Sequence, residues 1–392
     1  MISQDANTRR RVSEIRAVAE SHRKRVIDCN VGTPCDPVPE FVREAVSAAV
    51  AASGPYPLSA GSTDYRAAGA HRIARRFGIE IDASAVAACV GTKEFVASLP
   101  QYLRILARGS DRDHRDTILF PAIAYPTYAV GAAMAGLRSV PVSLDAQWNL
   151  DLATIDPVDA ERALALWVNV PGNPTGATAS RQHFDDVVRW GQEHGVVVVS
   201  DECYVEYAPE PHTILEAGTE GVLALHSLSK RSNFAGMRNG FYAGDPSLVQ
   251  QLIDLRREGG LIVPTPMQAG GIAVLADDVH VDEQRLRYER RRTFVIERLA
   301  AHGIEHVGGA MPFYLWLVQK SGAGTNAGES TGESTSDGFD LAMRFARCGW
   351  LTAPGATFGS AGTPYTRIAL VQPDHLLLEA LDRFDALNLS HS

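Results

Sequence analysis

The 392-residue sequence lacks the features of membrane proteins and of nucleic-acid-binding proteins. No stretch approaches the roughly 18 unbroken apolar residues of a membrane helix. The first residues, Met1 to Ala6, contain no apolar signal-peptide core. Acidic residues outnumber basic ones, 46 to 37, and a net charge of −9 disfavours binding to phosphate backbones. We therefore expect a soluble, cytoplasmic protein with no membrane or nucleic-acid partner.

Cysteine is also scarce, and its spacing excludes the usual cross-links. The five cysteines, Cys29, Cys35, Cys89, Cys203 and Cys348, form no C-x-x-C pair and have no histidine at zinc spacing. Neither a disulfide framework nor a metal site is expected. Each cysteine is interpreted as a small buried hydrophobe in a reducing compartment.

What the sequence does contain is the composition of a globular protein with a large core. Apolar residues make up 45% and charged residues 21%. The arginine runs at 9–11 and 287–292 are interpreted as solvated helix faces. Residues 320–338, rich in Gly, Ser, Thr and Glu, are interpreted as a flexible surface insertion because they have almost nothing apolar to bury. We see no internal repeat.

The hydrophobic pattern alternates between strands and helices, which predicts an α/β fold. The unbroken apolar run 196–199 is typical of a parallel strand that is covered on both faces. Expected strands are 85–90, 117–120, 138–142, 164–168, 196–199, 221–225, 240–243, 311–318 and 365–370. Expected helices are 8–24, 40–52, 63–77, 180–194, 246–257, 277–301 and 339–348, followed by a final helix. In such folds, ligands bind at the carboxyl ends of the strands.

One lysine follows a predicted strand in an unusual setting. After the apolar run 221–225 come two small hydroxyl residues, Ser227 and Ser229, then Lys230 on a turn closed by Gly236, with Arg238 eight residues further on. A lysine that is partly desolvated near other cations can form a Schiff base. A lone lysine after a strand is more often an exposed surface residue, so the assignment needs partners elsewhere in the chain.

Other strand ends supply such partners. Thr92 begins a predicted helix directly after a strand, and free amides at a helix start attract anions. Asn173 follows the strand at 164–168, while Asp201 and Tyr204 follow the strand at 196–199. Gly32, in a turn-rich loop, permits close approach of the backbone to a small ligand.

These motifs occur in a recognisable order. N-P-T-G at 173–176, S-D-E-C-Y at 200–204, and S-L-S-K at 227–230 are followed by Arg238 and a late Arg367. From Val26 to Arg367 the chain resembles fold-type I pyridoxal-phosphate (PLP) enzymes, in particular class I and II aminotransferases. Within these it is most similar to actinobacterial succinyldiaminopimelate aminotransferases.

The resemblance implies a large domain with a mostly parallel central sheet, plus a smaller α+β domain from both chain ends. We place an N-terminal arm at 1–38, the large domain at 39–276 and the small domain at 277–392. The long helix at 277–301 is expected to cross from one domain to the other.

The resemblance also implies roles around the cofactor ring. Lys230 would hold PLP as a Schiff base and act as the general base. Asp201 would pair with the ring nitrogen and keep it protonated. Asn173 and Tyr204 would hydrogen-bond the ring hydroxyl, and Tyr125 would stack on the ring face.

The other matching residues are implied to bind the cofactor phosphate or the substrate. Charge-assisted bonds suit a phosphate dianion, and the matching residues are Gly91, Thr92, Lys93, Ser227, Ser229 and Arg238. Tyr56 would reach the phosphate of a neighbouring subunit, which implies a homodimer. Arg367 would grip the substrate α-carboxylate together with Gly32 and Asn173.

The implied reaction moves an amino group between glutamate/2-oxoglutarate and an amino-dicarboxylate such as N-succinyl-LL-diaminopimelate. The sequence departs from the resembled enzymes at Tyr65, Ala122, Met237 and Asn239, where leucine, an acidic residue, tyrosine and alanine are expected. We interpret these either as positions that read the substrate or as neutral changes.

Two alternatives therefore stay open. One is a PLP enzyme of a specialised pathway performing β,γ-elimination, replacement or ring formation, for example on S-adenosylmethionine. The other is a regulatory protein on a degenerate fold. Such proteins usually lose the lysine or its aspartate partner, and both are present here.

Overall fold

A computed structural model of the chain describes residues 5–52, 54–320 and 337–389. Its largest element is a seven-stranded sheet in the order β2-β8-β7-β6-β5-β3-β4. The strands are parallel except β8, which is antiparallel to both its neighbours. Their bounds are β2 (Val86–Cys89), β3 (Thr117–Pro121), β4 (Arg138–Val142), β5 (Ala163–Asn169), β6 (Val197–Asp201), β7 (Val222–Ser227) and β8 (Gly240–Gly244). The predicted α/β class is confirmed.

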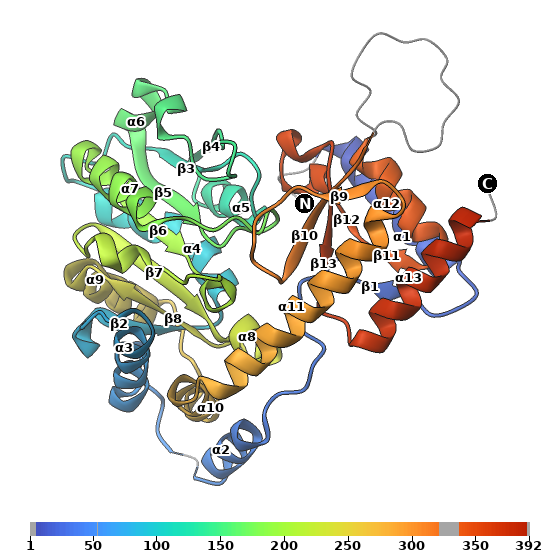
Figure 1. Cartoon of the computed structure of the whole chain (residues 1–392). Helices are drawn as coiled ribbons and strands as arrows, with labels where there is room; N and C mark the ends of the chain where they lie inside the picture. Colours follow the sequence, from blue (N-terminus) through green and yellow to red (C-terminus); the bar gives the residue numbers. More distant parts are fainter. Residues whose placement is uncertain (1–4, 53, 321–336, 390–392) are drawn as a thin grey trace.

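The apolar strands of this sheet are buried on both faces. All residues of β5 are buried. Its Leu166 packs in one hydrophobic cluster with Val188, and its neighbour Trp167 packs in a second cluster with Leu99. Alternate side chains of a strand point to opposite faces, so each face requires its own cover of helices. Helices lie on both sides of the sheet in Figure 1.

A smaller part of the molecule is built from both ends of the chain. It contains a four-stranded antiparallel sheet, β12-β13-β10-β9, and a parallel pair in which β1 joins β11. The helix α1 packs against α12, and Figure 1 shows α1, α11, α12 and α13 beside these strands. The bounds are β1 (Ile27–Asp28), β9 (Ile304–His306), β10 (Tyr314–Gln319), β11 (Trp350–Leu351), β12 (Ala353–Pro354) and β13 (Thr366–Ala369).

The helices differ from the predicted ones at α6 (Pro157–Arg162), α8 (Leu228–Arg231) and α10 (Thr265–Ala276), none of which was expected. Helix α10 was not among the expected helices, because T-P-M-Q-A-G-G-I-A-V-L-A has no polar face to give a helical period. It packs between α2 and α3. The helices are α1 (Ala6–Glu20), α2 (Glu40–Ala51), α3 (Thr63–Phe77), α4 (Thr92–Ala107), α5 (Thr127–Met134), α6 (Pro157–Arg162), α7 (Arg181–His194), α8 (Leu228–Arg231), α9 (Pro246–Glu258), α10 (Thr265–Ala276), α11 (Val279–Ala300), α12 (Gly338–Arg347) and α13 (Asp374–Leu389).

Some element ends also differ from the predicted ones. The first helix stops at Glu20, four residues before the predicted end. Strand β10 begins only at Tyr314, because the Met311 amide donates to the Gly176 carbonyl instead of joining the sheet. Strand β7 reaches Ser227, which brings its end closer to Lys230 than predicted.

Three predictions about surface and core need correction. Cys35 is exposed and Cys203 is partly exposed, so not every cysteine is a buried hydrophobe. Arg291, expected on a solvated face, is buried because its guanidinium binds the carboxylates of Asp36 and Asp374.

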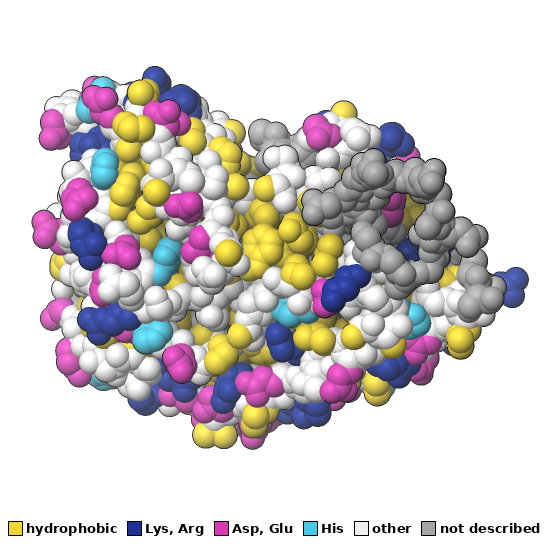
Figure 2. All heavy atoms as spheres, turned by 45° about the horizontal axis from the view of Figure 1, so that its top comes forward, with side chains coloured by type: hydrophobic (Ala, Val, Ile, Leu, Met, Phe, Trp, Pro, Cys, Tyr) yellow, Lys and Arg dark blue, Asp and Glu magenta, His cyan; other side chains and the backbone are white. Residues whose placement is uncertain are grey.

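The structure describes only part of the region predicted to be a surface insertion. The predicted insertion lies, from 321 to 336, outside the described residues. Among the described helices none is long and apolar enough to span a membrane. Figure 2 shows side chains of both charges interspersed over one face, with hydrophobic ones gathered between the two halves of the molecule.

Candidate active site

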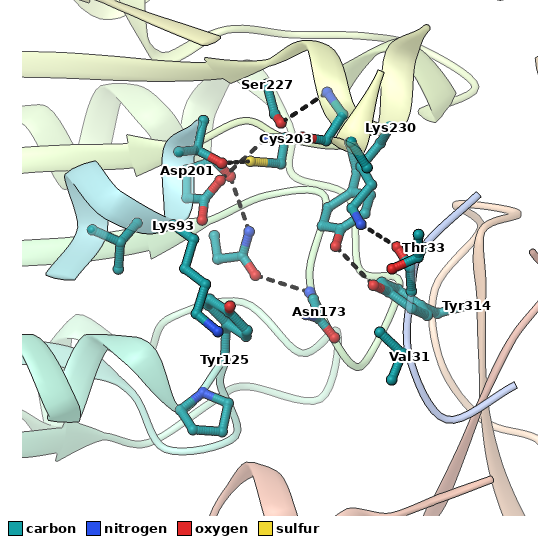
Figure 3. Close-up of a pocket in the computed structure, with 18 of the residues that line it drawn as sticks. Val31, Thr33, Lys93, Tyr125, Asn173, Asp201, Cys203, Ser227, Lys230 and Tyr314 are labelled. Carbon is teal, nitrogen blue, oxygen red and sulfur yellow. Dashed lines mark hydrogen bonds between the residues drawn. The ribbon is translucent and has the colours of Figure 1, made fainter. Parts of the chain in front are cut away.

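A cavity of about 750 Å³ lies between the carboxyl ends of the large sheet and the smaller part of the molecule. Of the predicted site residues, only Gly91 and Tyr56 are absent from its lining. The structure brings the others together: Gly32, Thr92, Lys93, Tyr125, Asn173, Asp201, Tyr204, Ser227, Ser229, Lys230, Arg238 and Arg367. Figure 3 shows how several of these side chains converge.

Lys230 was predicted to lie on a turn. It lies instead on the one-turn helix α8, directly after β7. The Ser227 hydroxyl accepts from the Ser229 amide and so caps this helix. The Lys230 amine donates to the Gly32 carbonyl, across the cavity (Figure 3). Burial, with a smaller contribution from Arg367 and Arg238, lowers the pKa of this amine from 10.5 to about 8.

The backbone of Lys230 is held from behind the cavity. The Tyr207 hydroxyl donates to the Lys230 carbonyl at 2.6 Å. The next residue, Arg231, donates to Glu206 at 2.8 Å and to Asp278 at 2.7 Å. Although burial alone raises the pKa of Glu206, neighbouring guanidinium groups hold it well below its usual value. A helix of one turn is unstable by itself, so these contacts fix the lysine.

Asp201 is buried at the end of β6 with both carboxylate oxygens occupied. One accepts from the Cys203 amide at 3.2 Å and the other from the Tyr128 hydroxyl at 2.8 Å. Burial raises the pKa of Asp201, while the bonds from Cys203 and Tyr128 oppose that rise. Tyr128 stacks on Trp167 with ring centroids 5.0 Å apart. Tyr128 and Cys203 were missed as site residues, although Cys203 lies within the S-D-E-C-Y motif at 200–204.

Arg367 reaches the cavity from β13 in the small sheet. Its guanidinium lies over the rings of Tyr314 and Phe358, 4.4 and 4.7 Å from their centroids. One terminal nitrogen donates to Asn173 Oδ1 at 2.7 Å and the other to the Asn30 carbonyl. The buried Nε has no hydrogen-bond partner among the described residues. A guanidinium held flat in this way is preorganised for a carboxylate.

Tyr204 and Tyr314 join the two sides of the cavity. Their hydroxyls lie 2.7 Å apart, and burial raises the pKa of Tyr204 well above its usual value. Tyr314 belongs to a predicted strand, but no pattern in the sequence indicates that its side chain faces the site. A Cβ at Gly32 would lie 2.2 Å from the Tyr314 hydroxyl, so glycine is required for this close approach.

The start of α4 lies against the guanidinium of Arg238. Gly91 has a φ of 74° and precedes the free amides of Thr92 and Lys93. A Cβ at Gly91 would lie 2.2 Å from Arg238 Nη2, so only glycine admits the guanidinium here. Lys93 Nζ lies 6.0 Å from the Tyr125 ring centroid, and Figure 3 shows the two side chains together.

The four departures from the resembled enzymes do not line the cavity. This corrects the prediction that they read the substrate. Tyr65 and Asn239 are fully buried, and the Tyr65 hydroxyl donates to Asn239 Oδ1 at 2.5 Å. The sequence places them 174 positions apart, and no local pattern shows that they are partners. Ala122 and Met237 also lie outside the lining residues.

Tyr56 lies away from the cavity and is 94% exposed. It borders a separate hollow of about 510 Å³ with Pro55, Pro57 and the segment 264–266. An aromatic side chain so exposed contributes almost nothing to the core of one chain.

Fold and cavity together define the class of protein. A mostly parallel sheet whose strand ends carry a buried aspartate and a buried lysine, facing an arginine from a smaller sheet, is the arrangement of a fold-type I PLP enzyme. The family described as aminotransferase class I and II matches residues 24–383. The chain belongs to this family, whose members are PLP-dependent enzymes.

Individual relatives give the same assignment. The chain is 36% identical to a 4-dedimethylamino-4-oxo-anhydrotetracycline transaminase of Streptomyces rimosus, over 93% of this chain and 94% of that one. It is 33% identical to an LL-diaminopimelate aminotransferase of Desulforudis audaxviator, over 95% and 93% of the two chains. A solved probable N-succinyldiaminopimelate aminotransferase of Thermus thermophilus superposes with a TM-score of 0.82 at 26% identity, covering 96% and 98%.

Proposed function

We propose that this aminotransferase moves an amino group between glutamate/2-oxoglutarate and an amino-dicarboxylate such as N-succinyl-LL-diaminopimelate. The observation that carries the proposal is the pairing of two cation positions in one cavity. Arg367 offers a preorganised guanidinium, and Lys93 offers an exposed amine that has no acidic partner among the described residues.

The residues present fit PLP. When bound, the cofactor stabilises negative charge at the substrate α-carbon and carries the amino group. Lys230 would bond to it and move the proton, because burial keeps half of its amine neutral at a pH of about 8. Asp201 would pair with the ring nitrogen, Asn173 and Tyr204 with the ring hydroxyl, and Tyr125 with the ring face.

The phosphate of the cofactor would lie in the corner formed by α4 and Arg238. The amides of Thr92 and Lys93 point out of a helix start, and Arg238 closes over Gly91. Ser227, at the end of β7, and Ser229, on α8, would add hydroxyl donors.

Lys93 would bind the second carboxylate of the substrate. The α-carboxylate would lie on Arg367 with help from the Gly32 amide and Asn173, which leaves the distal end of the substrate toward Tyr125. The Lys93 side chain extends to that ring, and a second carboxylate there gains a charge-assisted bond. The diaminopimelate relatives support a dicarboxylate substrate.

A second candidate substrate is a polycyclic ketone. The cavity lining also includes uncharged residues, among them Val12, Val31, Pro126 and Phe358. Such residues suit a large apolar ring system. The tetracycline transaminase relative acts on a substrate of this kind. Lys93 separates the two candidates, because a ketone of this type has no second carboxylate to bind.

The enzyme would act as a homodimer, with Tyr56 contributed across the interface to the phosphate of the partner. Val50 and Tyr56 are exposed and border the same hollow, which supports this arrangement, because contiguous exposed apolar side chains mark interaction sites. Mass photometry of the wild type would reveal a dimer, and Tyr56→Ala would weaken cofactor binding.

The experiment that tests the function is a substrate panel on the loaded enzyme. Amino donors are added one at a time, and the cofactor absorbance and product masses are recorded. The proposal requires that glutamate converts the cofactor and yields 2-oxoglutarate, and that N-succinyl-LL-diaminopimelate is a second donor. Lys93→Met should raise KM for both dicarboxylates about 10- to 100-fold and leave KM for alanine unchanged.

Other products would point elsewhere. Methylthioadenosine released from S-adenosylmethionine without an oxo acid would support elimination chemistry instead. Amination of a polycyclic ketone, undiminished in Lys93→Met, would support the second candidate.

A further inference from the structure

Tyr65 and Asn239 form a buried polar pair just outside the cavity. Tyr65 lies on α3 and Asn239 directly precedes β8. Neither side chain is exposed to solvent. The Tyr65 hydroxyl lies 2.5 Å from Asn239 Oδ1 and 2.9 Å from the Gly240 carbonyl. Buried polar atoms that are fully bonded fix a local conformation far more tightly than apolar contacts do.

Asn239 connects four elements of the fold. Its Oδ1 accepts from Tyr65 on α3, its Nδ2 donates to the Met267 carbonyl on α10, and its own carbonyl accepts from the Leu228 amide on α8. Gly271 makes room for this arrangement, since a Cβ there would lie 2.6 Å from Tyr65 Cε2 and 2.7 Å from Asn239 Nδ2. The position of Asn239 is therefore set by contacts on three sides.

Arg238, the residue before Asn239, has a strained backbone. Its φ is 51°, in the left-handed region that residues with a Cβ rarely adopt. Such a conformation persists only when the surroundings impose it. The side chain of Arg238 donates to the Ala235 carbonyl at 2.9 Å. Because this side chain is exposed, that bond alone is a weak restraint on the backbone conformation of Arg238. The restraint comes from the next residue, Asn239.

We propose that Tyr65 and Asn239 act as a coupled pair that positions Arg238 against the helix start at Gly91, where it binds the phosphate of the cofactor. The inference rests on the proposed role of Arg238 at the phosphate. Neither member of the pair touches the cavity, so both are positioning residues. Their effect is confined to the anionic end of the cofactor.

The two side chains are expected to depend on each other. Loss of the tyrosine hydroxyl alone leaves Asn239 Oδ1 buried without its donor. Loss of the asparagine alone leaves the Met267 carbonyl without its side-chain donor. The bond between the two side chains is lost in either single variant, so the two losses should be less than additive, although each side chain also has a contact of its own, with the Gly240 or the Met267 carbonyl.

The test is a double-mutant cycle on cofactor affinity. Tyr65→Phe, Asn239→Ala and the double variant are prepared as apoenzymes, and Kd is measured by fluorescence for PLP and for pyridoxal, which has the same ring without the phosphate. Each single variant should raise Kd for PLP about 10-fold, and the double variant should raise Kd by clearly less than the additive 100-fold, because the bond between the two side chains is already lost in either single variant. Kd for pyridoxal should change less than about twofold.

Two further variants complete the design. Tyr242→Phe is the matched control, because the Tyr242 hydroxyl is buried on β8 with no hydrogen-bond partner in the described part of the chain. It should leave both affinities unchanged. Arg238→Ala tests the role on which the inference rests, and it should raise Kd for PLP while sparing pyridoxal.

The outcomes are distinguishable. Equal weakening of PLP and pyridoxal, or no weakening of either, would mean that the pair serves only folding and would overturn the proposal. A 100-fold loss in the double variant would overturn the coupling. If Arg238→Ala leaves the ratio of the two affinities unchanged, the phosphate role of Arg238 fails, and this inference fails with it. If the pair variants leave the ratio of the PLP and pyridoxal affinities unchanged but Arg238→Ala changes it, the phosphate role of Arg238 stands and the positioning role of the pair is refuted.

Discussion

The two walls of the cavity are assembled in different ways. On the large-sheet wall, Asp201, Ser227 and Lys230 lie at the ends of adjacent parallel strands, β6 and β7, within a short stretch of the chain. On the opposite wall, Arg367 donates to the carbonyl of Asn30, 337 positions away. Parallel strands bring their carboxyl ends to one edge of the sheet. The second wall instead depends on the packing of segments from both chain ends.

The two walls are expected to have different functions. The large-sheet wall holds the groups proposed to act on the cofactor, and the opposite wall holds the groups proposed to select the substrate. Variants on the first wall should therefore change the chemical step most, and variants on the second should change substrate affinity.

Lys230→Ala should have the largest effect, because it removes both the covalent attachment and the proposed general base. We expect kcat to fall at least about 1,000-fold, measured by coupled assay with glutamate. Lys24→Ala is the control, since this exposed lysine pairs with Glu379 on the surface, and it should retain full activity. A fall of less than about tenfold in Lys230→Ala would contradict the assignment.

Arg367→Lys should come next and should act on affinity. A lysine cannot reproduce the planar guanidinium, so KM for amino acid donors should rise about 10- to 100-fold. Arg383→Lys is the matched control, because Arg383 is a largely buried arginine of α13 that binds Glu379 and the Arg25 carbonyl. It should lower thermal stability without changing KM. Equal changes of KM in the two variants would remove the distinction between the walls.

Tyr314→Phe should have a smaller effect. It removes the hydroxyl that lies 2.7 Å from that of Tyr204, and a single neutral hydrogen bond contributes roughly 1 kcal/mol. We expect a change of about fivefold in kcat/KM, in steady-state assays with glutamate. If neither kcat nor KM changes, the contact between Tyr204 and Tyr314 does not couple the two walls.

The pH dependence of apoenzyme stability should show the smallest effect. The pKa of Lys230 in the folded protein, about 8, lies below its ordinary value of 10.5. Between these values the unfolded chain holds the extra proton, so this group makes stability rise with pH in that window. Lys230→Met should therefore be more stable than wild type at pH 7, with the gap in Tm narrowing from pH 8 to 10.5. A constant gap would contradict the lowered pKa.

Much of the large-sheet wall was predictable because its residues follow strands directly. Asp201 and Lys230 lie just after apolar runs, and the order of the motifs indicated their family. Tyr314 was missed because its direction depends on the pairing of β10 with β13, where Tyr314 lies opposite Ala369. Sequence periodicity does not determine such a register between distant strands.

The departures from the resembled enzymes were misread for a similar reason. Tyr65 and Asn239 looked like separate changes near a substrate, yet they are one hydrogen-bonded pair outside the cavity. The domain division at 38/39 and 276/277 and the role of each site residue stay predictions.

The most direct test of the central claim, that the cofactor is attached to the large-sheet wall at Lys230, is peptide mapping. The loaded enzyme is reduced with borohydride, digested and analysed by mass spectrometry. The account predicts the mass of the reduced cofactor on the peptide that contains Lys230 and on no other lysine peptide. Cofactor mass on a different lysine, or on none, would contradict it.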